Sequence, residues 1–482
     1  MPEPRPAKPT NAEDVEALCK RAERAEREGA ALRQEHDRLR RENERLRREN
    51  DRLRHEVDAA RRAGFRQAAP FSKGQPARHP RRPGRKPGAA YGHAAHRPTP
   101  TRIDETYTAP IPGRCPRCAG PLIETAVATQ YQEELPPVQP IVRAFHVHIG
   151  QCQQCGRRVQ GRHPLQTSDA LGAAAAQVGP RATATAAVLH TQFGVPFGKI
   201  AAFYQQHFGL TITAGGLVHA LHRTARQATP TYAALIQTVR HALVVVPDET
   251  GWKVGAQLQW LWVFATATTT VYAILPGRGF DEATTILGED FAGVLVRDGW
   301  APYRRFTAAI WQSCLNHLLG HCRTLQVQHP HSPFAAQVAA VLTQALALRN
   351  RRDAGTVSAH GVAVARGHLW NRLNRLVDTH SVVPAVQRVA THVARELPGV
   401  FTFLLDPAID ATNWRAEQAI RPAVVTRKVC GGNRTEHGAH TQYVLATVLR
   451  TSTQRHLDPL PILTDLLHDA APRISGALCA PT

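Results

Sequence analysis

Two apolar segments in the middle of the chain each end on an acidic residue, and this pattern constrains how that part folds. The first runs from Val244 to Val246 and reaches Asp248, and the second begins at Gly293 and reaches Asp298. β-Branched residues favour strands. A carboxylate at the end of a buried strand is costly unless something pairs with it, and a metal ion is one such partner. We therefore expect two strands that carry their acids to a common site.

Two further strands and a helix are expected between these acids. Aromatic and β-branched residues mark strands at 260–266 and 270–276, and a helix-like stretch spans 280–287. The order is then three strands, a helix and a fourth strand. In a mixed sheet with the first and fourth strands adjacent, Asp248 and Asp298 would lie side by side.

A third acid, Glu417, lies far along the chain in a segment that reads as a helix beginning at Thr412 or Asn413. Asn413, Glu417 and Arg421 recur every four residues and so share one helix face. Two aspartates on strands and a glutamate on a helix supply the hard oxygen ligands of two Mg²⁺ or Mn²⁺ ions. Such ions, about 3.5–4 Å apart, hold the attacking and leaving oxygens of a phosphodiester. Each acid taken alone is more often a solvated surface carboxylate.

Two other acids compete for these roles. Glu249 follows Asp248, but adjacent strand residues point to opposite faces, so Glu249 is expected to be structural. Asp290 is the alternative to Asp298, although it precedes its strand and does not end it.

The N-terminal region repeats a seven-residue pattern. Its d positions are Leu18, Ala25, Leu32, Leu39, Leu46 and Leu53. Glutamates at g can pair with arginines at e on a second copy, and Asn43 and Asn50 at a favour two parallel strands. Residues 13–63 are therefore expected to form a coiled coil that makes a homodimer. The alternative is a single solvated, charged helix.

The segment that follows is basic. Residues 61–100 contain ten Lys or Arg and no acid, and the whole chain has a formal net charge of +21, which favours a polyanionic partner. Such a segment cannot bury a core and is expected to be disordered. Its cations can neutralise DNA phosphates or enter a narrow minor groove. The candidate DNA contacts are Arg81, Arg82, Arg85 and Lys86. A plain flexible linker is the alternative.

Four of the nine cysteines form two Cys-x-x-Cys pairs, Cys115 with Cys118 and Cys152 with Cys155. The two pairs supply the four thiolates of a tetrahedral zinc site. Four protein ligands leave no position for water, so this Zn²⁺ would be structural. A redox pair or plain reduced thiols are the alternatives.

Residues 180–228 have helical periodicity. From Lys199 the pattern predicts a helix, a short turn from Gly209 to Ile212, and a second helix capped by Thr213. This spacing is that of a helix-turn-helix, which would contact DNA. A helical hairpin that packs in a core reads similarly.

No targeting or membrane segment is expected. The N-terminus lacks the apolar core of a signal peptide. No apolar run approaches the roughly 20 residues of a spanning helix. We therefore expect a cytoplasmic protein without a membrane partner.

Four segments carry a specific resemblance. They read "DETGW", "RDGWAPY", "TNWRAE" and "RKVCGGNRTEHGA", in this order. Together they resemble bacterial insertion-sequence transposases of the TnpC type, the insertion sequence sixty-six family, and the resemblance covers nearly the whole chain. It implies an RNase H-like core with an Asp-Asp-Glu triad of Asp248, Asp298 and Glu417. It also implies a helical insertion between the second and third acids, and a zinc ribbon.

The chain departs from the family pattern in two places. The third acid is followed by Gln418, where the family often has arginine. The usual Cys-x-x-His-x-x-Arg helix reads "CLNHLLGHC", with Gly320 and His321 at the place of the arginine. Cys314, His317 and His321 share one helix face, for which packing against the sheet is favoured over metal binding.

The function implied by the resemblance is that of a DNA transposase, which cuts and joins the ends of an insertion sequence by two-metal-ion phosphoryl transfer. Its partners would be double-stranded DNA (the element ends and the target), a second copy of the chain and accessory transposition proteins, at the bacterial nucleoid. Arg421, Arg427 and Lys428 are candidates for phosphate contacts. The alternatives are an RNase H-like nuclease that does not join strands and a non-catalytic, zinc-containing DNA-binding regulator.

These expectations describe a multidomain α/β protein. Its expected parts are a coiled coil (13–63), a basic disordered linker (64–106), a zinc ribbon (107–162), a helix-turn-helix-like DNA-binding domain (163–240), the first part of an RNase H-like mixed-sheet core (241–310), a helical insertion (311–398), the second part of the core with the catalytic Glu (399–450) and a C-terminal tail (451–482).

Overall fold

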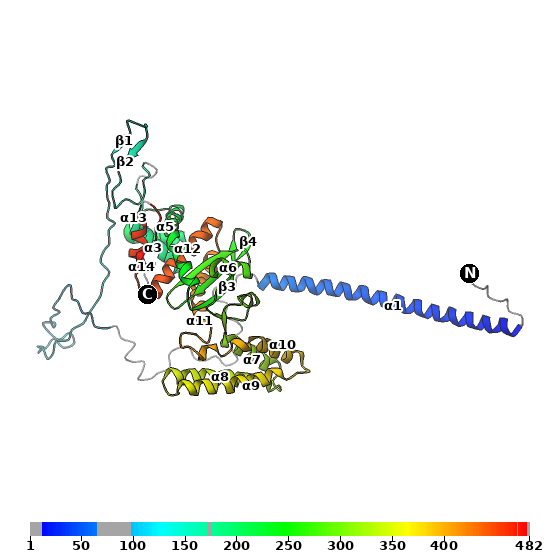
Figure 1. Ribbon diagram of the computed structural model, residues 1–482. Helices are drawn as coiled ribbons and strands as arrows, with labels where there is room; N and C mark the ends of the chain where they lie inside the picture. Colours follow the sequence, from blue (N-terminus) through cyan, green and yellow to red (C-terminus); the bar gives the residue numbers. More distant parts are fainter. Residues whose placement is uncertain (1–11, 65–97, 172–175, 470, 480–482) are drawn as a thin grey trace. The chain divides into compact units, whose positions relative to one another are not determined.

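The computed structural model describes residues 12–64, 98–171, 176–469 and 471–479 of the chain (Figure 1). The chain divides into two compact units, Met1–Pro87 and Gly88–Thr482. Most of the expected basic linker lies outside the described residues, and this includes the candidate DNA contacts Arg81, Arg82, Arg85 and Lys86.

The first unit contains one long helix, α1 (Ala12–Gly64). Its sequence is rich in Glu, Arg and Leu, which are strong helix formers. The leucines of the d positions form an exposed row along it. Leu18, Leu32, Leu39, Leu46 and Leu53 are between 52% and 72% exposed. A leucine row at this spacing is the surface that a coiled-coil partner covers.

The second unit is built around a five-stranded mixed sheet with strand order β5-β4-β3-β6-β7. The strands are β3 (Val244–Val254), β4 (Gln257–Ala265), β5 (Thr270–Leu275), β6 (Val294–Arg297) and β7 (Ile310–Ser313). β4 is antiparallel to β3 and β5, whereas β6 is parallel to β3 and β7. Helix α6 (Phe280–Leu287) connects β5, in the antiparallel part of the sheet, to β6, in the parallel part. The expected strands, and the adjacency of the first and fourth, are thus confirmed.

Alternate residues of β3 face two different cores. Val246 packs with α11 (Trp414–Cys430) and the helices that follow β7, whereas Val245 packs with α5 (Ala214–Arg240) and α6. Because strand side chains alternate, Asp248 lies on the face of Val246 and Glu249 on the face of Val245.

The β5 edge of the sheet is covered by α12 (Glu436–Gln454). The backbone N–H groups of Thr270 and Tyr272 donate to the Oγ1 atoms of Thr451 (3.2 Å) and Thr447 (3.0 Å). Hydroxyl groups at a helical spacing thus satisfy the edge of the sheet, which would otherwise offer its backbone to another strand.

The helical insertion follows β7. It contains α7 (Leu315–Gln328), α8 (Phe334–Asp353), α9 (Ala359–Asp378) and α10 (Pro384–Glu396). It begins later than the expected residue 311, because residues 310–313 pair with β6 as an edge strand. The buried residues of β7 are the polar Gln312 and Ser313, so the segment does not read as a strand in the sequence.

A second group of helices shares a core beside the sheet. It contains α3 (Pro180–Thr191), α4 (Phe197–Phe208), α5, α12, α13 (Pro459–His468) and α14 (Gly476–Cys479). α4 ends at the left-handed Gly209, and the Thr213 side chain accepts from the Gly216 N–H at the start of α5. The expected helix, turn and helix are therefore present.

The expected C-terminal tail contains helices within its described residues, 451–469 and 471–479. α13 packs against α3 and buries Ile462, Leu463 and Leu466 in the shared core. Two prolines at its start, at residues 459 and 461, make this ten-residue helix read as a loop.

A short antiparallel ribbon precedes these helices. β1 (Ile149–Gln151) pairs with β2 (Arg158–Gln160), and Cys152 and Cys155 lie in the loop between them. Among the described residues, no helix is both long and apolar enough to cross a membrane.

Candidate active site

Asp248 on β3 and Asp298, the residue that follows β6, come at equivalent distances along two adjacent parallel strands. The β3–β6 ladder pairs Val244 with Val294. Each aspartate is the fourth residue after its valine, so strand alternation directs both to the same face of the sheet. The ladder ends at Val245 and Leu295, before the two aspartates.

Glu417 is carried to this face by α11. That helix packs against β3 and β4, and Glu417 lies exposed in its first turn. Asn413 stands at the N-cap position and is 1% exposed, but its side chain makes no hydrogen bond to the helix; its Oδ1 accepts instead from the Cys314 thiol (3.1 Å) at the start of α7. This contact fixes the start of α11, and with it Glu417, against the end of β7.

The carboxylates of the site are electrostatically coupled. Burial, together with the charges of Glu249, Asp298 and Glu417, raises the pKa of Asp248 to about 7, against one opposing hydrogen bond from the Glu249 N–H. Interactions between charges weaken with distance and with screening by solvent. Asp298 and Glu417 therefore lie within electrostatic range of Asp248, and a cation would relieve the accumulated negative charge.

His317 adds a positive charge to the site. Contact with Cys314 raises the pKa of His317 to about 9, and Asp298 and Glu417 add to the rise, while burial opposes it. His317 is therefore cationic at neutral pH, near two of the three acids. Sequence reasoning favoured a packing role for it. The sequence feature that could have indicated a role in the site is the position of His317 one turn after Cys314, at the start of a helix that faces the sheet.

Glu249 lies on the opposite face of the sheet, as expected. Its carboxylate accepts from Arg278 Nε (2.7 Å) and from Tyr303 Oη (2.6 Å). The Arg278 guanidinium in turn lies 4.0 Å from the centroid of the Trp300 ring. Glu249 thereby holds the loop after Asp298 against β3, which is a structural role.

A buried ion-pair network lies directly behind Asp298. Arg297 is 0% and Glu396 1% exposed, with Nη1 and Oε2 2.9 Å apart. Arg304 (2.8 Å) and Ser313 Oγ (2.7 Å) also contact the Glu396 carboxylate. Burial acts to raise the pKa of Glu396, but these partners outweigh burial and hold the pKa below its usual value. Since Glu396 ends α10, the network ties the helical insertion to the strand that presents Asp298.

The two Cys-x-x-Cys pairs adopt the same local fold. The Ala119 N–H donates to the Cys115 carbonyl (2.8 Å), and the Gly156 N–H donates to the Cys152 carbonyl (2.9 Å). Ala119 and Gly156 are both left-handed, with φ of 56° and 70°. Two loops separated in sequence thus close in the same way around a cysteine.

The same loops favour thiolates. Hydrogen bonds from backbone N–H groups, first that of Arg117 and then that of Cys118, lower the pKa of the Cys115 thiol. The pKa of Cys152 is lowered in the same way, first by the Cys155 N–H. The thiolate is the form of cysteine that binds metals.

The donor types fit the expected metals, although the side chains do not close into a metal-binding cluster. Across residues 12–64, 98–171, 176–469 and 471–479, no three His, Cys, Asp or Glu side chains form a group that could hold a metal ion. Carboxylate oxygens are what Mg²⁺ prefers, and thiolates are what structural Zn²⁺ prefers. Like charges repel, so three carboxylates come together only against a cation.

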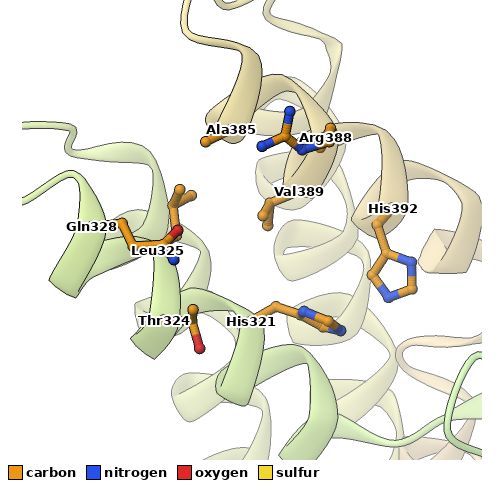
Figure 2. Close-up of a pocket in the computed structure, with 8 residues that line it drawn as sticks. All are labelled: His321, Thr324, Leu325, Gln328, Ala385, Arg388, Val389 and His392. Atoms are coloured by element: carbon orange, nitrogen blue, oxygen red, sulfur yellow. The ribbon is translucent and has the colours of Figure 1, made fainter. Parts of the chain in front are cut away.

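His321 does not join Cys314 and His317. It points into a cavity of about 270 Å³ between α7 and α10, where its ring centroid lies 4.9 Å from that of His392 (Figure 2). Arg388 lines the same cavity. Cys314 and His317 therefore lie together, whereas His321 lies in this separate cavity.

The three basic candidates on α11 differ in their surroundings. Arg421 and Lys428 are exposed. Arg427 is half-buried, and its Nη1 donates to Thr250 Oγ1 (3.1 Å) and to the Gly251 carbonyl. Arg427 therefore ties α11 to β3 just beyond Asp248.

Asp248→Asn should stabilise the protein at pH 8 when no divalent ion is added. The pKa of Asp248 is raised from 3.8 to about 7. Its contribution to stability is therefore complete below the unfolded pKa and is lost as pH rises through the folded pKa. Asparagine does not ionise, so the free energy of unfolding should rise by about 2–4 kcal/mol at pH 8 and change little near about pH 4. Urea unfolding at both pH values measures this. Asp290→Asn, at an exposed acid, is the control, and an equal effect of Asp248→Asn at both pH values would contradict the assignment.

The chain matches the model of a known protein family. The Transposase IS66 family matches residues 175–441, which is more than half of the chain and includes Asp248, Asp298 and Glu417. A search of curated proteins found no match.

Proposed function

The chain belongs to the IS66 family of transposases, and from this membership we propose that it cuts and joins the DNA ends of an insertion sequence. The observation that carries the proposal is the register of Asp248 and Asp298 on adjacent parallel strands, with Glu417 near enough to raise the pKa of Asp248. The strand order, with two parallel strands added to an antiparallel trio, is the support for an RNase H-like core.

Asp248, Asp298 and Glu417 would hold two Mg²⁺ or Mn²⁺ ions. Bound ions of this kind supply the Lewis acidity for in-line attack of a water or a DNA 3′-hydroxyl on phosphorus and for stabilising the leaving oxygen. The three side chains contribute hard oxygen donors and a negative charge that attracts the ions.

The neighbouring residues position these acids. The Arg297–Glu396 pair supports the strand end at Asp298, and the Asn413–Cys314 contact supports the helix turn at Glu417. His317 brings a positive charge that balances part of the negative charge. Exposed Arg421 and Lys428 are suited to phosphate contacts outside the carboxylate cluster.

A structural Zn²⁺ in the two cysteine loops is part of the proposal. The matched loop geometry and the lowered pKa values of Cys115 and Cys152 support it. Purified protein should contain about one Zn²⁺ per chain, and Cys152→Ser should remove nearly all of it, because three thiolates leave the tetrahedral site open. Metal analysis measures this. Cys19→Ser, at an exposed cysteine on α1, is the control, and full zinc retention in Cys152→Ser would refute the site.

Dimerisation through α1 is also proposed, because two element ends must be held together before they are joined. Leu39→Glu places a charge at the centre of the leucine row in both copies. The dimer Kd should rise at least roughly a hundredfold, measured by sedimentation equilibrium. Arg41→Glu, on the outer face of the same turn, should leave the Kd nearly unchanged. Equal effects of the two substitutions would mean that the leucine row is not the interface.

A strand-transfer assay tests the function. The protein is incubated with Mg²⁺, a DNA fragment that carries both ends of the element encoding it, and a target plasmid. The proposal predicts cleaved ends and joined products. Cleavage without joining would assign the nuclease alternative, and DNA binding without cleavage would assign the non-catalytic regulator.

A further inference from the structure

We infer that a cavity of about 560 Å³, between the α3–α5 helices and the junction of α11 with α12, binds one nucleotide of the DNA substrate with its base unstacked. Cavities of about 300–1,000 Å³ are typical of small-ligand sites. We call it the α5–α12 cavity. The inference deepens the proposed function and rests on it, because it names how the substrate strand is held beside the carboxylates.

The wall of the cavity that lies against β3 is rigid. Asn433 Oδ1 accepts from Trp252 Nε1 (2.8 Å), and the Asn433 backbone bonds to the Lys253 carbonyl (2.9 Å) and the Gly255 N–H (2.8 Å). At Gly432 an added Cβ would lie 2.3 Å from the Lys253 carbonyl oxygen, so only glycine permits this approach. The "GGN" sequence thus builds a fixed wall and not a mobile loop.

The charge of the lining favours an anion. Arg427 and Arg434 line the cavity, and none of its described lining residues is Asp or Glu. The N-termini of α5 and α12 also open onto it, at Gly215 and Thr435. Helix N-termini carry partial positive charge and backbone N–H donors, which suit a phosphate.

Flat rings in the lining favour a planar group. His190 stacks on Phe197 with centroids 3.9 Å apart, and both line the cavity. His222, also in the lining, stacks on His437 with centroids 3.8 Å apart. Such surfaces accept a nucleic-acid base by stacking, whatever its sequence. Arginines without acids, combined with flat rings, select a nucleoside phosphate over an apolar or cationic ligand.

The cavity and the carboxylates share one helix. Glu417 lies in the first turn of α11, and Arg427 lies in its last turns. Ten residues of helix span about 15 Å, which is roughly four nucleotides at 3.4 Å each. The cavity therefore lies within a few nucleotides of Glu417 along α11.

Gly215→Leu tests the inference by filling the cavity. An added Cβ at Gly215 meets only Thr213 Oγ1, at 4.0 Å, so a side chain can start here without a clash. Gly367→Leu is the matched control, since an added Cβ there meets nothing within 4 Å and Gly367 lies in α9, outside the cavity. Full-length protein is titrated, without divalent ions, into a fluorescein-labelled dT decamer and into an abasic decamer of equal length. A single strand is used because it avoids the cost of unpairing.

Wild type and Gly367→Leu should bind the dT decamer about tenfold more tightly than the abasic one, as expected for stacking of a base. In Gly215→Leu the ratio should fall to near one while abasic binding is unchanged. Arg434→Gln should weaken binding of both probes. A ratio of one in wild type, or a ratio preserved in Gly215→Leu, would overturn the inference.

Competition identifies the source of the nucleotide. Thymidine 5′-monophosphate should compete with the dT decamer only weakly, and equally strong competition would assign the cavity to a free nucleotide. Failure of the cavity assignment and failure of the proposed function give different results. Cleavage activity with a ratio of one removes the cavity assignment alone, whereas base discrimination without cleavage removes the transposase assignment alone.

Discussion

Asp248→Asn should lower the rate of Mg²⁺-dependent DNA cleavage by at least about 10³-fold, which corresponds to about 4 kcal/mol of transition-state stabilisation. Asparagine keeps the size of the side chain and removes the charge that attracts a divalent ion. The same substitution should stabilise the fold at pH 8, because it removes a carboxylate whose pKa is raised to about 7. Loss of activity would therefore accompany a gain in stability, which separates a site residue from a structural one. Cleavage of end-labelled element DNA measures the rate.

Asp298→Asn and Glu417→Gln should have effects of similar size. Asp290→Asn is the control, because Asp290 is exposed and precedes β6. It should retain at least about half of the wild-type rate, as expected of a surface carboxylate outside the site. A comparable loss in Asp290→Asn, or full activity in Asp248→Asn, would overturn the assignment of the triad.

Glu396→Ala should lower the free energy of unfolding by about 3–5 kcal/mol, because it leaves the fully buried Arg297 without its counter-charge. It should also lower DNA cleavage, since Arg297 precedes Asp298 in the chain. Urea unfolding at pH 7 measures the stability. The pKa of Glu396 is held low, so the stability that it provides is present above the usual carboxyl pKa and is lost as pH falls through the folded pKa.

Asp281→Ala is the matched control for that prediction. Asp281 pairs with Arg305 at 3.7 Å, and the two side chains are 89% and 63% exposed. Removing such a pair should cost no more than about 0.5 kcal/mol. Equal decreases in the free energy of unfolding for Glu396→Ala and Asp281→Ala would show that the buried Glu396 network stabilises the protein no more than an exposed ion pair does.

Much of the sheet was predictable from the sequence because its signals are local. Val244–Val246 and 293–296 are short apolar segments, and an acid follows each within two residues. The register that pairs Val244 with Val294 comes from the structure. The start of α11 was also predictable from the preference of Asn for the N-cap position, although in the structure the Asn413 side chain contacts Cys314 and does not bond to the helix.

Other features depend on contacts that no local pattern contains. The partner of Arg297 is Glu396, almost a hundred residues away in the sequence, and the partner of Asn413 is Cys314. β7 was not predicted, because its buried residues, Gln312 and Ser313, are polar. A polar strand of this kind is stabilised by tertiary hydrogen bonds, such as that from the Phe403 N–H to Gln312 Oε1 (2.7 Å), which sequence periodicity does not report.

Manganese binding, measured by electron paramagnetic resonance of free Mn²⁺ with zinc-loaded protein and element DNA, tests most directly whether the three acids act together. Wild type and Asp290→Asn should bind Mn²⁺ saturably. Affinity should be at least about tenfold weaker in Asp248→Asn, Asp298→Asn and Glu417→Gln alike, because each substitution removes a ligand charge from a shared site. Wild-type affinity in Glu417→Gln would refute a shared site, because the helix-borne acid would then lie outside it.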